Sequence, residues 1–201
     1  MPFFIVFIAL LYGFQILQYR IGWDKIKSVN KQAYTPKVSV VIAMRNEESE
    51  IIRLITDLKK QIYPTDKLEF ILVNDHSTEA TLELLQQSAM DNLQIVNMPD
   101  GEFGKKNAIK KAIALAEGEI ILATDADCSF SPTWVQTMAS YFADSNIKLV
   151  SGPVGFHKQK GVFQSLQTLE FASLIGSGAG AIGMDKAIFC NGANMAYQKD
   201  I

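Results

Sequence analysis

Short apolar runs and amphipathic segments alternate along most of the chain. Four runs have the length and β-branched content of buried strands, and they cover residues 38–43, 68–73, 93–97 and the stretch that begins at Ile120. Apolar side chains recur at helical spacing between and after them, which predicts helices over 51–62, 78–90, 105–116 and 132–142. This alternation predicts an α/β fold, a mostly parallel sheet with helices on both faces.

The pattern becomes irregular after Val150. Residues 162–175 show helical spacing, and residues 187–190 and 193–197 read as short strands. The glycine-rich run 176–180 lies between them, without a strand before it or a helix straight after it. A phosphate-binding loop needs a strand before it and a helix after it, so this run does not match one. We predict instead that it forms a mobile loop beside the functional site.

The N-terminal segment is the most apolar part of the chain. From Pro2 to Tyr19 only Gln15 and Gln18 are strongly polar. The length of this apolar run is at the lower limit for a membrane span. Basic residues follow the apolar run, whereas a cleaved signal peptide has them before it. Positive charge after the run indicates that its C-terminal end lies in the cytoplasm. We predict a membrane anchor helix over 1–19, a basic linker over 20–36 and a cytosolic domain over 37–201. A helix packed on the domain itself is the alternative.

The composition is that of an ordinary globular protein and argues against nucleic-acid binding and cysteine-based sites. Apolar residues make up 48% and charged residues 20% of the 201 residues, as in an ordinary globular protein with one substantial core. The net charge of −2 gives no support for nucleic-acid binding. Cys128 and Cys190 have neither the spacing of a metal site nor that of a disulfide framework.

Polar clusters follow three of the predicted strands. They are Arg45-Asn46-Glu47, Asn74-Asp75 and Asp125-Ala126-Asp127. Asn46 and the acids after it also have the chemistry of a helix start. Because ligands of such sheets bind beyond the carboxyl ends of the strands, we expect all three clusters to face one cleft.

Asp125 and Asp127 are the strongest candidates for chemistry. In an extended chain side chains two apart point the same way, so the two carboxylates converge and repel each other. A divalent cation relieves that repulsion, and Mg²⁺ or Mn²⁺ suits a site with two carboxylates whose shell is completed by water and substrate phosphates. The alternative is that both acids are solvated loop residues or caps for the helix near Pro132.

Five segments together resemble family 2 glycosyltransferases of the GT-A fold. They stand in the family's order, at 38–48, 72–78, 104–108, 124–127 and 192–197. The resemblance implies a nucleotide-diphosphate-sugar donor, a UDP-sugar, whose sugar passes with inversion to a polysaccharide, lipid or other acceptor. With the anchor helix, it implies an enzyme of the inner membrane that builds envelope polysaccharide on the cytosolic side.

The resemblance also implies roles for individual residues in the donor pocket. The backbone around Ala43 and the side chains of Arg45 and Glu47 would line the nucleoside pocket. Asp75 would accept a hydrogen bond from the uracil ring, and Lys105 would lie near the base or the phosphates. His76 and His157 are interpreted as structural or surface residues.

The same resemblance assigns the metal and leaves the catalytic base open. Asp125 would face the ribose and the metal, and Asp127 would ligate Mg²⁺ or Mn²⁺. The family's base, an acidic residue, is expected beyond Ile201, and Glu170, Asp185 and Asp200 do not match its motif. We therefore interpret the sequence as a fragment of a longer enzyme. The alternative holds if 201 residues is the natural length: the protein would then be a membrane-tethered nucleotide-sugar-binding module with little or no transfer.

Three other enzyme classes fit the motifs less well. A haloacid-dehalogenase phosphatase usually opens its domain with two aspartates, whereas here they follow a late strand. A sugar-nucleotide pyrophosphorylase and a dinucleotide oxidoreductase both need a glycine-rich loop after the first strand. Residues 43–46 are Ala-Met-Arg-Asn, which is not such a loop.

Overall fold

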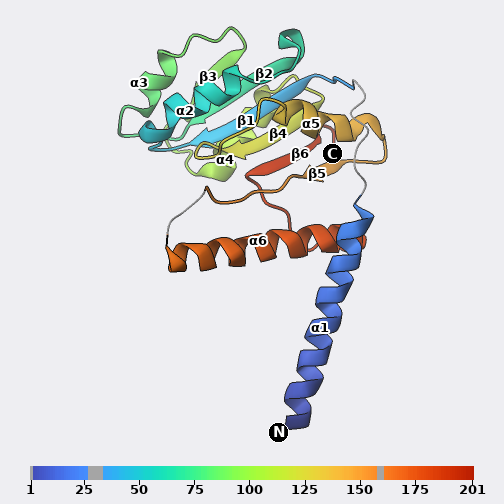
Figure 1. Ribbon diagram of the computed structural model, residues 1–201. Coiled ribbons are helices and arrows are strands. Elements are labelled where there is room, and N and C mark those ends of the chain that lie inside the picture. The colour runs from blue at the N-terminus through green and yellow to red at the C-terminus, as the bar shows by residue number, and fades with distance from the viewer. Residues whose placement is uncertain (1, 27–33, 158–160) are drawn as a thin grey trace. The chain divides into compact units, whose positions relative to one another are not determined.

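The computed structural model describes residues 2–26, 34–157 and 161–201, and within them six strands form one sheet in the order β3-β2-β1-β4-β6-β5 (Figure 1). The strands are β1 (Val38–Met44), β2 (Leu68–Asn74), β3 (Leu93–Asn97), β4 (Ile120–Asp125), β5 (Leu149–Ser151) and β6 (Asn194–Gln198). β1 pairs in parallel with β2 and β4, and β2 with β3. β6 runs antiparallel to both β4 and β5. The predicted α/β fold is confirmed.

The described helices alternate with the strands over most of the chain. They are α1 (Pro2–Lys25), α2 (Glu48–Lys59), α3 (Thr81–Gln86), α4 (Lys105–Leu115), α5 (Trp134–Ser140) and α6 (Val162–Gly183), with 3₁₀ turns at Thr65–Lys67 and Tyr141–Ala143. Parallel strands need such crossover connections, which explains why one helix separates each pair of consecutive parallel strands.

Helices cover both faces of the sheet, so consecutive side chains of the central strands enter two different cores. Val40 and Ile42 of β1 pack in the core that contains Leu54 of α2, whereas Val41 packs in the core of α4. On α4 the residues that meet the sheet are Ala108 and Ala112, both fully buried. Small side chains let this helix lie close to the strands. A continuous apolar run is what a strand covered on both faces requires.

Three predictions about helix starts were wrong, and the first concerns Asn46, which does not cap α2. Its backbone is left-handed, with φ of 56°, and the position before the helix belongs to Glu47, which makes no side-chain cap. Asn46 Oδ1 instead accepts a 2.8 Å hydrogen bond from the backbone N–H of Thr78. The bond holds Thr78 in the loop after β2, so α3 begins at Thr81 and not at 78 as predicted. The Ser131-Pro132 start is also wrong, since α5 begins at Trp134.

The region after residue 150 differs most from the sequence prediction. The glycine run 176–180, predicted to be a mobile loop, lies inside α6, which extends to Gly183. Residues 187–190 form no strand, while the strand predicted over 193–197 is present as β6. β5 was not predicted, because three residues are too short to show a pattern of alternation.

Internal contacts divide the chain into two compact units. One comprises Met1–Val29 and Pro153–Asn191 and holds α1 and α6; the other comprises Asn30–Gly152 and Gly192–Ile201 and holds the sheet. Among the described helices, α1 alone is long and apolar enough to cross a membrane. It continues to Lys25, six residues into the segment predicted to be a linker.

Candidate functional site

The parallel strands β1, β2 and β4 end at one edge of the sheet. In the register of β1, Met44 lies opposite Asn74 of β2 and Ala43 lies opposite Asp125 of β4. The loops that follow these strands and the start of α4 enclose a cavity of about 410 Å³, within the size range of ligand pockets. The three polar clusters therefore face one cavity, as expected.

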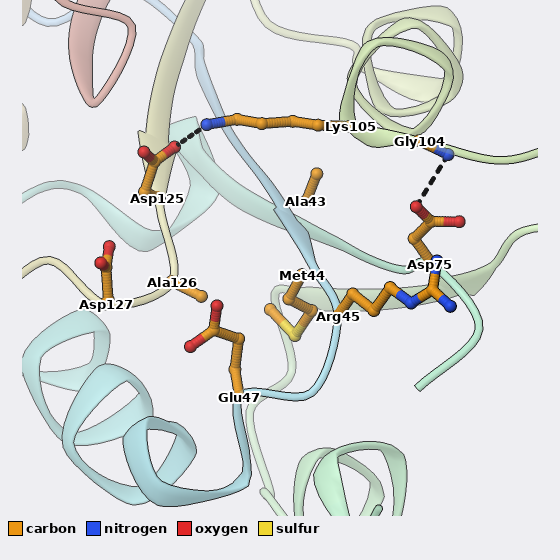
Figure 2. Close-up of a pocket in the computed structure, with 10 residues that line it drawn as sticks. All are labelled: Ala43, Met44, Arg45, Glu47, Asp75, Gly104, Lys105, Asp125, Ala126 and Asp127. Carbon is orange, nitrogen blue, oxygen red and sulfur yellow. Dashed lines mark hydrogen bonds and ion pairs between the residues drawn. The ribbon is translucent and has the colours of Figure 1, made fainter. Parts of the chain in front are cut away.

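The cavity brings together every site residue predicted from the sequence. Figure 2 shows Ala43, Arg45, Glu47, Asp75, Lys105, Asp125 and Asp127 around it, and Met44, Gly104 and Ala126 complete the lining. In that view the carboxylates of Asp125, Asp127 and Glu47 lie toward the left and Asp75 lies at the right. The cavity thus has an acidic end and a separate end at Asp75.

Asp75 is the buried acid of the site, with only 4% of its surface exposed. Its Oδ2 accepts a 2.8 Å hydrogen bond from the backbone N–H of Gly104, and His76 Nδ1 lies 3.0 Å from Oδ1. Burial raises the pKa of Asp75, but the bonds from His76 and Gly104 and the charge of Arg45 outweigh burial and lower it overall. The carboxylate is therefore ionised and points at fixed donors.

Gly104 can turn its N–H toward Asp75 because its φ is 93°, a conformation that L side chains rarely adopt. The residue before it, Phe103, places its ring against the imidazole of His76, with centroids 4.4 Å apart. His76 Nε2 is buried and has no hydrogen-bond partner in the described residues. His76 is thus a support for Asp75, in line with its interpretation as a structural residue.

Lys105 and Asp125 form an ion pair across the cavity, from the first residue of α4 to the last residue of β4. Lys105 Nζ lies 2.5 Å from Asp125 Oδ1, and the two side chains are 60% and 32% exposed. Solvent weakens such a pair, so it contributes little to stability. What it provides is a cation that can move between Asp125 and a bound anion.

Arg53 of α2 holds the loop that carries Asp127. Its guanidinium donates a 2.8 Å hydrogen bond to the backbone carbonyl of Asp127 and another to Ser129 Oγ. The same side chain binds Glu50 through Nε, at 3.0 Å. A planar group with five N–H donors can tie three acceptors together. Arg53 therefore fixes the backbone on which the Asp127 carboxylate is mounted.

Glu47 brings a third carboxylate to the acidic end. Its backbone N–H donates to Thr81 Oγ1 at 2.9 Å, which fixes the turn that carries it. Burial and then the charge of Asp127 raise the pKa of the Glu47 carboxyl, with smaller contributions from other acids that include Asp125. Glu47 therefore adds a third carboxylate beside Asp125 and Asp127.

The acidic end suits a hard cation shared with a ligand. Oxygen donors from Asp125 and Asp127 are what Mg²⁺ and Mn²⁺ prefer, and both carboxylates line the same cavity. No group of three His, Cys, Asp or Glu side chains within the described ranges is arranged to hold a metal alone. A cation would thus need further ligands from a substrate.

β6 supports the acid pair from the far side of β4. Thr124 Oγ1, directly before Asp125, donates a 2.7 Å hydrogen bond to the carbonyl of Ala193. Trp134 Nε1 of α5 donates to Asn194 Oδ1 at 3.0 Å. The segment that begins at Gly192 is therefore bound to both the strand and the helix that flank the acids.

Sequence reasoning did not identify Arg53 or the lining role of Met44 and Ala126. Arg53 looks like any exposed helix residue three positions after a glutamate. Only the fold shows that its guanidinium reaches a loop more than seventy residues further along the chain. No sequence signal could have found it.

A comparison with protein families matches residues 39–201 to the family described as Glycosyl transferase family 2. Among curated proteins, Glycosyltransferase AglE of Haloferax volcanii is 32% identical over 123 residues. That match covers 60% of this chain and 40% of AglE, so the chain spans well under half of the length of this relative.

Solved structures give the same fold. The mannosyltransferase PcManGT of Pyrobaculum calidifontis, in complex with GDP-Man and Mn²⁺, has a TM-score of 0.72 and 23% identity over 98% of this chain and 55% of its own. Residues 1–349 of S. aureus TarS, in complex with UDP-GlcNAc, have a TM-score of 0.53 and 26% identity over 63% of this chain and 36% of that one.

Proposed function

The chain belongs to glycosyltransferase family 2, and from this we propose that it binds a nucleotide-diphosphate-sugar, a UDP-sugar, in the cavity at the carboxyl edge of its sheet. One observation carries the proposal: a single cavity holds the buried Asp75 carboxylate with its fixed donor Gly104 at one end and the carboxylates of Glu47, Asp125 and Asp127 at the other. A nucleoside diphosphate has a base for the first end and a metal-binding diphosphate for the second.

At the nucleoside end, Asp75 accepts a hydrogen bond from the N–H of the uracil ring. Its two oxygens each have a second lone pair free in addition to the bonds from Gly104 and His76. Arg45, Glu47 and the backbone around Ala43 line the same space. The bound UDP-GlcNAc of the TarS structure supports uracil as the base.

At the acidic end, Asp125 and Asp127 hold Mg²⁺ or Mn²⁺, and Lys105 turns from Asp125 to the phosphates. The cation, when bound, stabilises the negative charge that grows on the departing nucleoside diphosphate. Mn²⁺ in the PcManGT complex supports a divalent metal in this fold. Two carboxylates with substrate phosphates are an ordinary ligand set for such ions.

The whole protein, of which the chain resembles one part, transfers the sugar to a glycan or lipid acceptor with inversion of configuration. The match to AglE covers 40% of that relative, so transfer is proposed for the whole protein and not for the chain alone. α1 anchors the protein in the cytoplasmic membrane, because it is apolar and fully exposed along most of its length. Arg20 and Lys25 near its C-terminal end keep the sheet unit in the cytosol.

Calorimetry with UDP, in the presence and absence of Mn²⁺, tests the donor site. We expect UDP to bind with Mn²⁺ and much more weakly without it, because the diphosphate and the acid pair share the cation. ADP with Mn²⁺ is the matched control, since adenine lacks the ring N–H that Asp75 accepts. Equal binding of UDP and ADP, or no binding of either, would contradict the proposal.

Replacing Arg53 by lysine is expected to lower the affinity for UDP with Mn²⁺ by about tenfold, as for other groups that orient a metal ligand. Lysine keeps the charge but cannot join Glu50, Ser129 and the Asp127 carbonyl at once. Arg20→Lys, outside the cavity, is the control. An unchanged affinity in R53K would show that the loop of Asp127 keeps its position without this guanidinium.

Replacing Glu47 by glutamine is expected to flatten the pH dependence of stability of the metal-free protein. Because burial and nearby carboxylates raise its pKa above 4.5, the folded state holds this proton more tightly than the unfolded chain. Stability contributed by Glu47 is present below pH 4.5 and is lost as the pH rises through the raised pKa.

Urea unfolding in detergent across this pH range measures the effect of E47Q. Since Glu47 is partly exposed, we expect a gain of at most about 1 kcal/mol at neutral pH. Glu83→Gln, on the exposed face of α3, is the control. A steeper fall of stability with pH in E47Q than in the native protein would be the opposite of the expected sign.

A further inference from the structure

One side of α6 exposes a row of large apolar side chains to solvent. At 100° per residue these positions fall within less than half of the helix circumference. They are Val162 (80% exposed), Phe163 (68%), Leu166 (59%), Leu169 (67%) and Leu174 (51%). Scattered apolar residues on a surface need no explanation, but five on one helix face mark an interaction surface. We call these five residues the α6 face.

Aromatic residues of its own unit cover a neighbouring side of α6. The rings of Phe171 and Phe156 lie 4.7 Å apart. A Cβ on Gly178 would lie 2.7 Å from the ring of Phe189, so that ring rests directly on the helix backbone. The orientation of α6 in its unit is therefore fixed by packing beside the α6 face, which these contacts leave exposed.

α6 also crosses α1 with its backbone in contact (Figure 1). A Cβ on Gly22 would lie 1.9 Å from the carbonyl oxygen of Gly180, and one on Gly180 would lie 2.3 Å from that of Tyr19. Gly22 is about 30 Å along the helix axis from Pro2, which is the thickness of the hydrocarbon core of a bilayer. The crossing thus falls where a spanning α1 would leave the hydrocarbon.

We propose that α6 lies in the plane of the membrane surface with the α6 face inserted among the lipids. The inference rests on the proposed membrane span of α1, and it adds a second contact with the same bilayer. An apolar helix face held at this depth meets the boundary between headgroups and acyl chains, where such helices bury about 5–10 Å deep.

Charge and composition favour the lipid surface over other occupants. Arg20, Lys25 and the exposed Lys186 lie within a few residues of the crossing glycines. They outnumber the acids there, which are Asp24, paired with Arg20, and Asp185, and an excess of cations attracts anionic headgroups. Glu170 lies among the positions of the α6 face, and α6 is not apolar enough to count as a membrane span. A carboxylate among these apolar positions suits the headgroup boundary rather than the hydrocarbon centre.

Site-directed fluorescence in vesicles tests the proposal on the full chain. Cys128 and Cys190 are replaced by serine, a single cysteine is placed at Leu166, and an environment-sensitive nitrobenzoxadiazole dye is attached. The matched control carries the same dye at Ile52, an apolar side chain of α2 that is 71% exposed in the sheet unit. Both proteins are reconstituted in vesicles of phosphatidylcholine and phosphatidylglycerol that contain nitroxide-labelled lipids.

We expect the dye at position 166 to shift to the blue and to lose most of its emission to the nitroxides. A nitroxide near the headgroup end of the acyl chain should quench more strongly than one near the terminal methyl. The dye at position 52 should stay in water and be quenched little. This pattern supports an interfacial α6.

Carbonate extraction and UDP binding of the same samples separate this inference from the proposed function. If the protein resists extraction and binds UDP, but the dye at 166 behaves like the dye at 52, the inference alone is overturned. A blue-shifted dye that nitroxides do not reach, and whose shift grows with protein density, would assign the α6 face to a second copy and also overturn it. If carbonate released the protein from the vesicles, both the proposed membrane span of α1 and this inference would be contradicted.

Discussion

Replacing Asp127 by alanine is expected to abolish the Mn²⁺-dependent part of UDP binding. Groups that only orient a metal ligand are worth tenfold to a hundredfold in affinity, so loss of the ligand itself should cost at least about a hundredfold. The described residues offer no cluster of three metal-ligating side chains, so the protein ligand set is small and the loss of one member is costly. Mn²⁺ alone should bind the native protein weakly, because the diphosphate completes the shell.

Calorimetry of D127A with UDP and Mn²⁺ measures the loss, and Asp91→Ala is the matched control. Asp91 is an exposed aspartate two residues before β3, at the amino end of the strands and so at the other edge of the sheet. Removing Asp127 also removes a charge that raises the pKa of Glu47, so that pKa should move down toward its ordinary value. Native affinity in D127A, or tight binding of Mn²⁺ without UDP, would refute the shared-cation site.

The sequence predicted the positions of the site residues better than the details of the loops between them. β-branched runs such as Val38–Ile42 identify strands buried on both faces, and the rule that ligands bind at the carboxyl edge then places the polar clusters together. The register confirms this, with Ala43 beside Asp125. Local pattern and general topology were sufficient at this level.

Predictions failed where a contact distant in sequence decides the local conformation. Asn46 has the chemistry of a helix cap, but its side chain binds the backbone of Thr78, thirty-two residues away. Glycines such as Gly180 usually weaken a helix by about 0.5–1 kcal/mol relative to alanine. In α6 they permit backbone contact with α1, which a local reading of the sequence cannot see.

Replacing Asp75 by asparagine is expected to weaken UDP binding by about tenfold to a hundredfold, the range for a hydrogen bond that involves a charged group. The amide has the shape of the carboxylate and keeps one acceptor for the N–H of Gly104. It loses the charge and one of the two acceptor oxygens, so it cannot serve Gly104, His76 and the uracil N–H together.

The same substitution should change stability in acid. The folded pKa of Asp75 is lowered, since the bonds from His76 and Gly104 exceed the effect of burial, so its stabilising contribution is present above pH 3.8 and is lost as the pH falls through the folded value. D75N should lack this dependence. Urea unfolding at a series of acidic pH values measures it, and a native pH profile in D75N would show that the carboxylate is not stabilised in the fold.

Two ligands then separate recognition of the base from support of the loop. Pyrophosphate with Mn²⁺ has the diphosphate and metal but no base, so D75N should bind it as tightly as the native protein does while UDP binds less tightly. If Asp75 only held Gly104 in place, Lys105 next to it would shift as well, and both ligands would lose affinity equally. The ratio of the two affinities therefore reports whether the buried carboxylate touches the nucleotide or merely positions the start of α4.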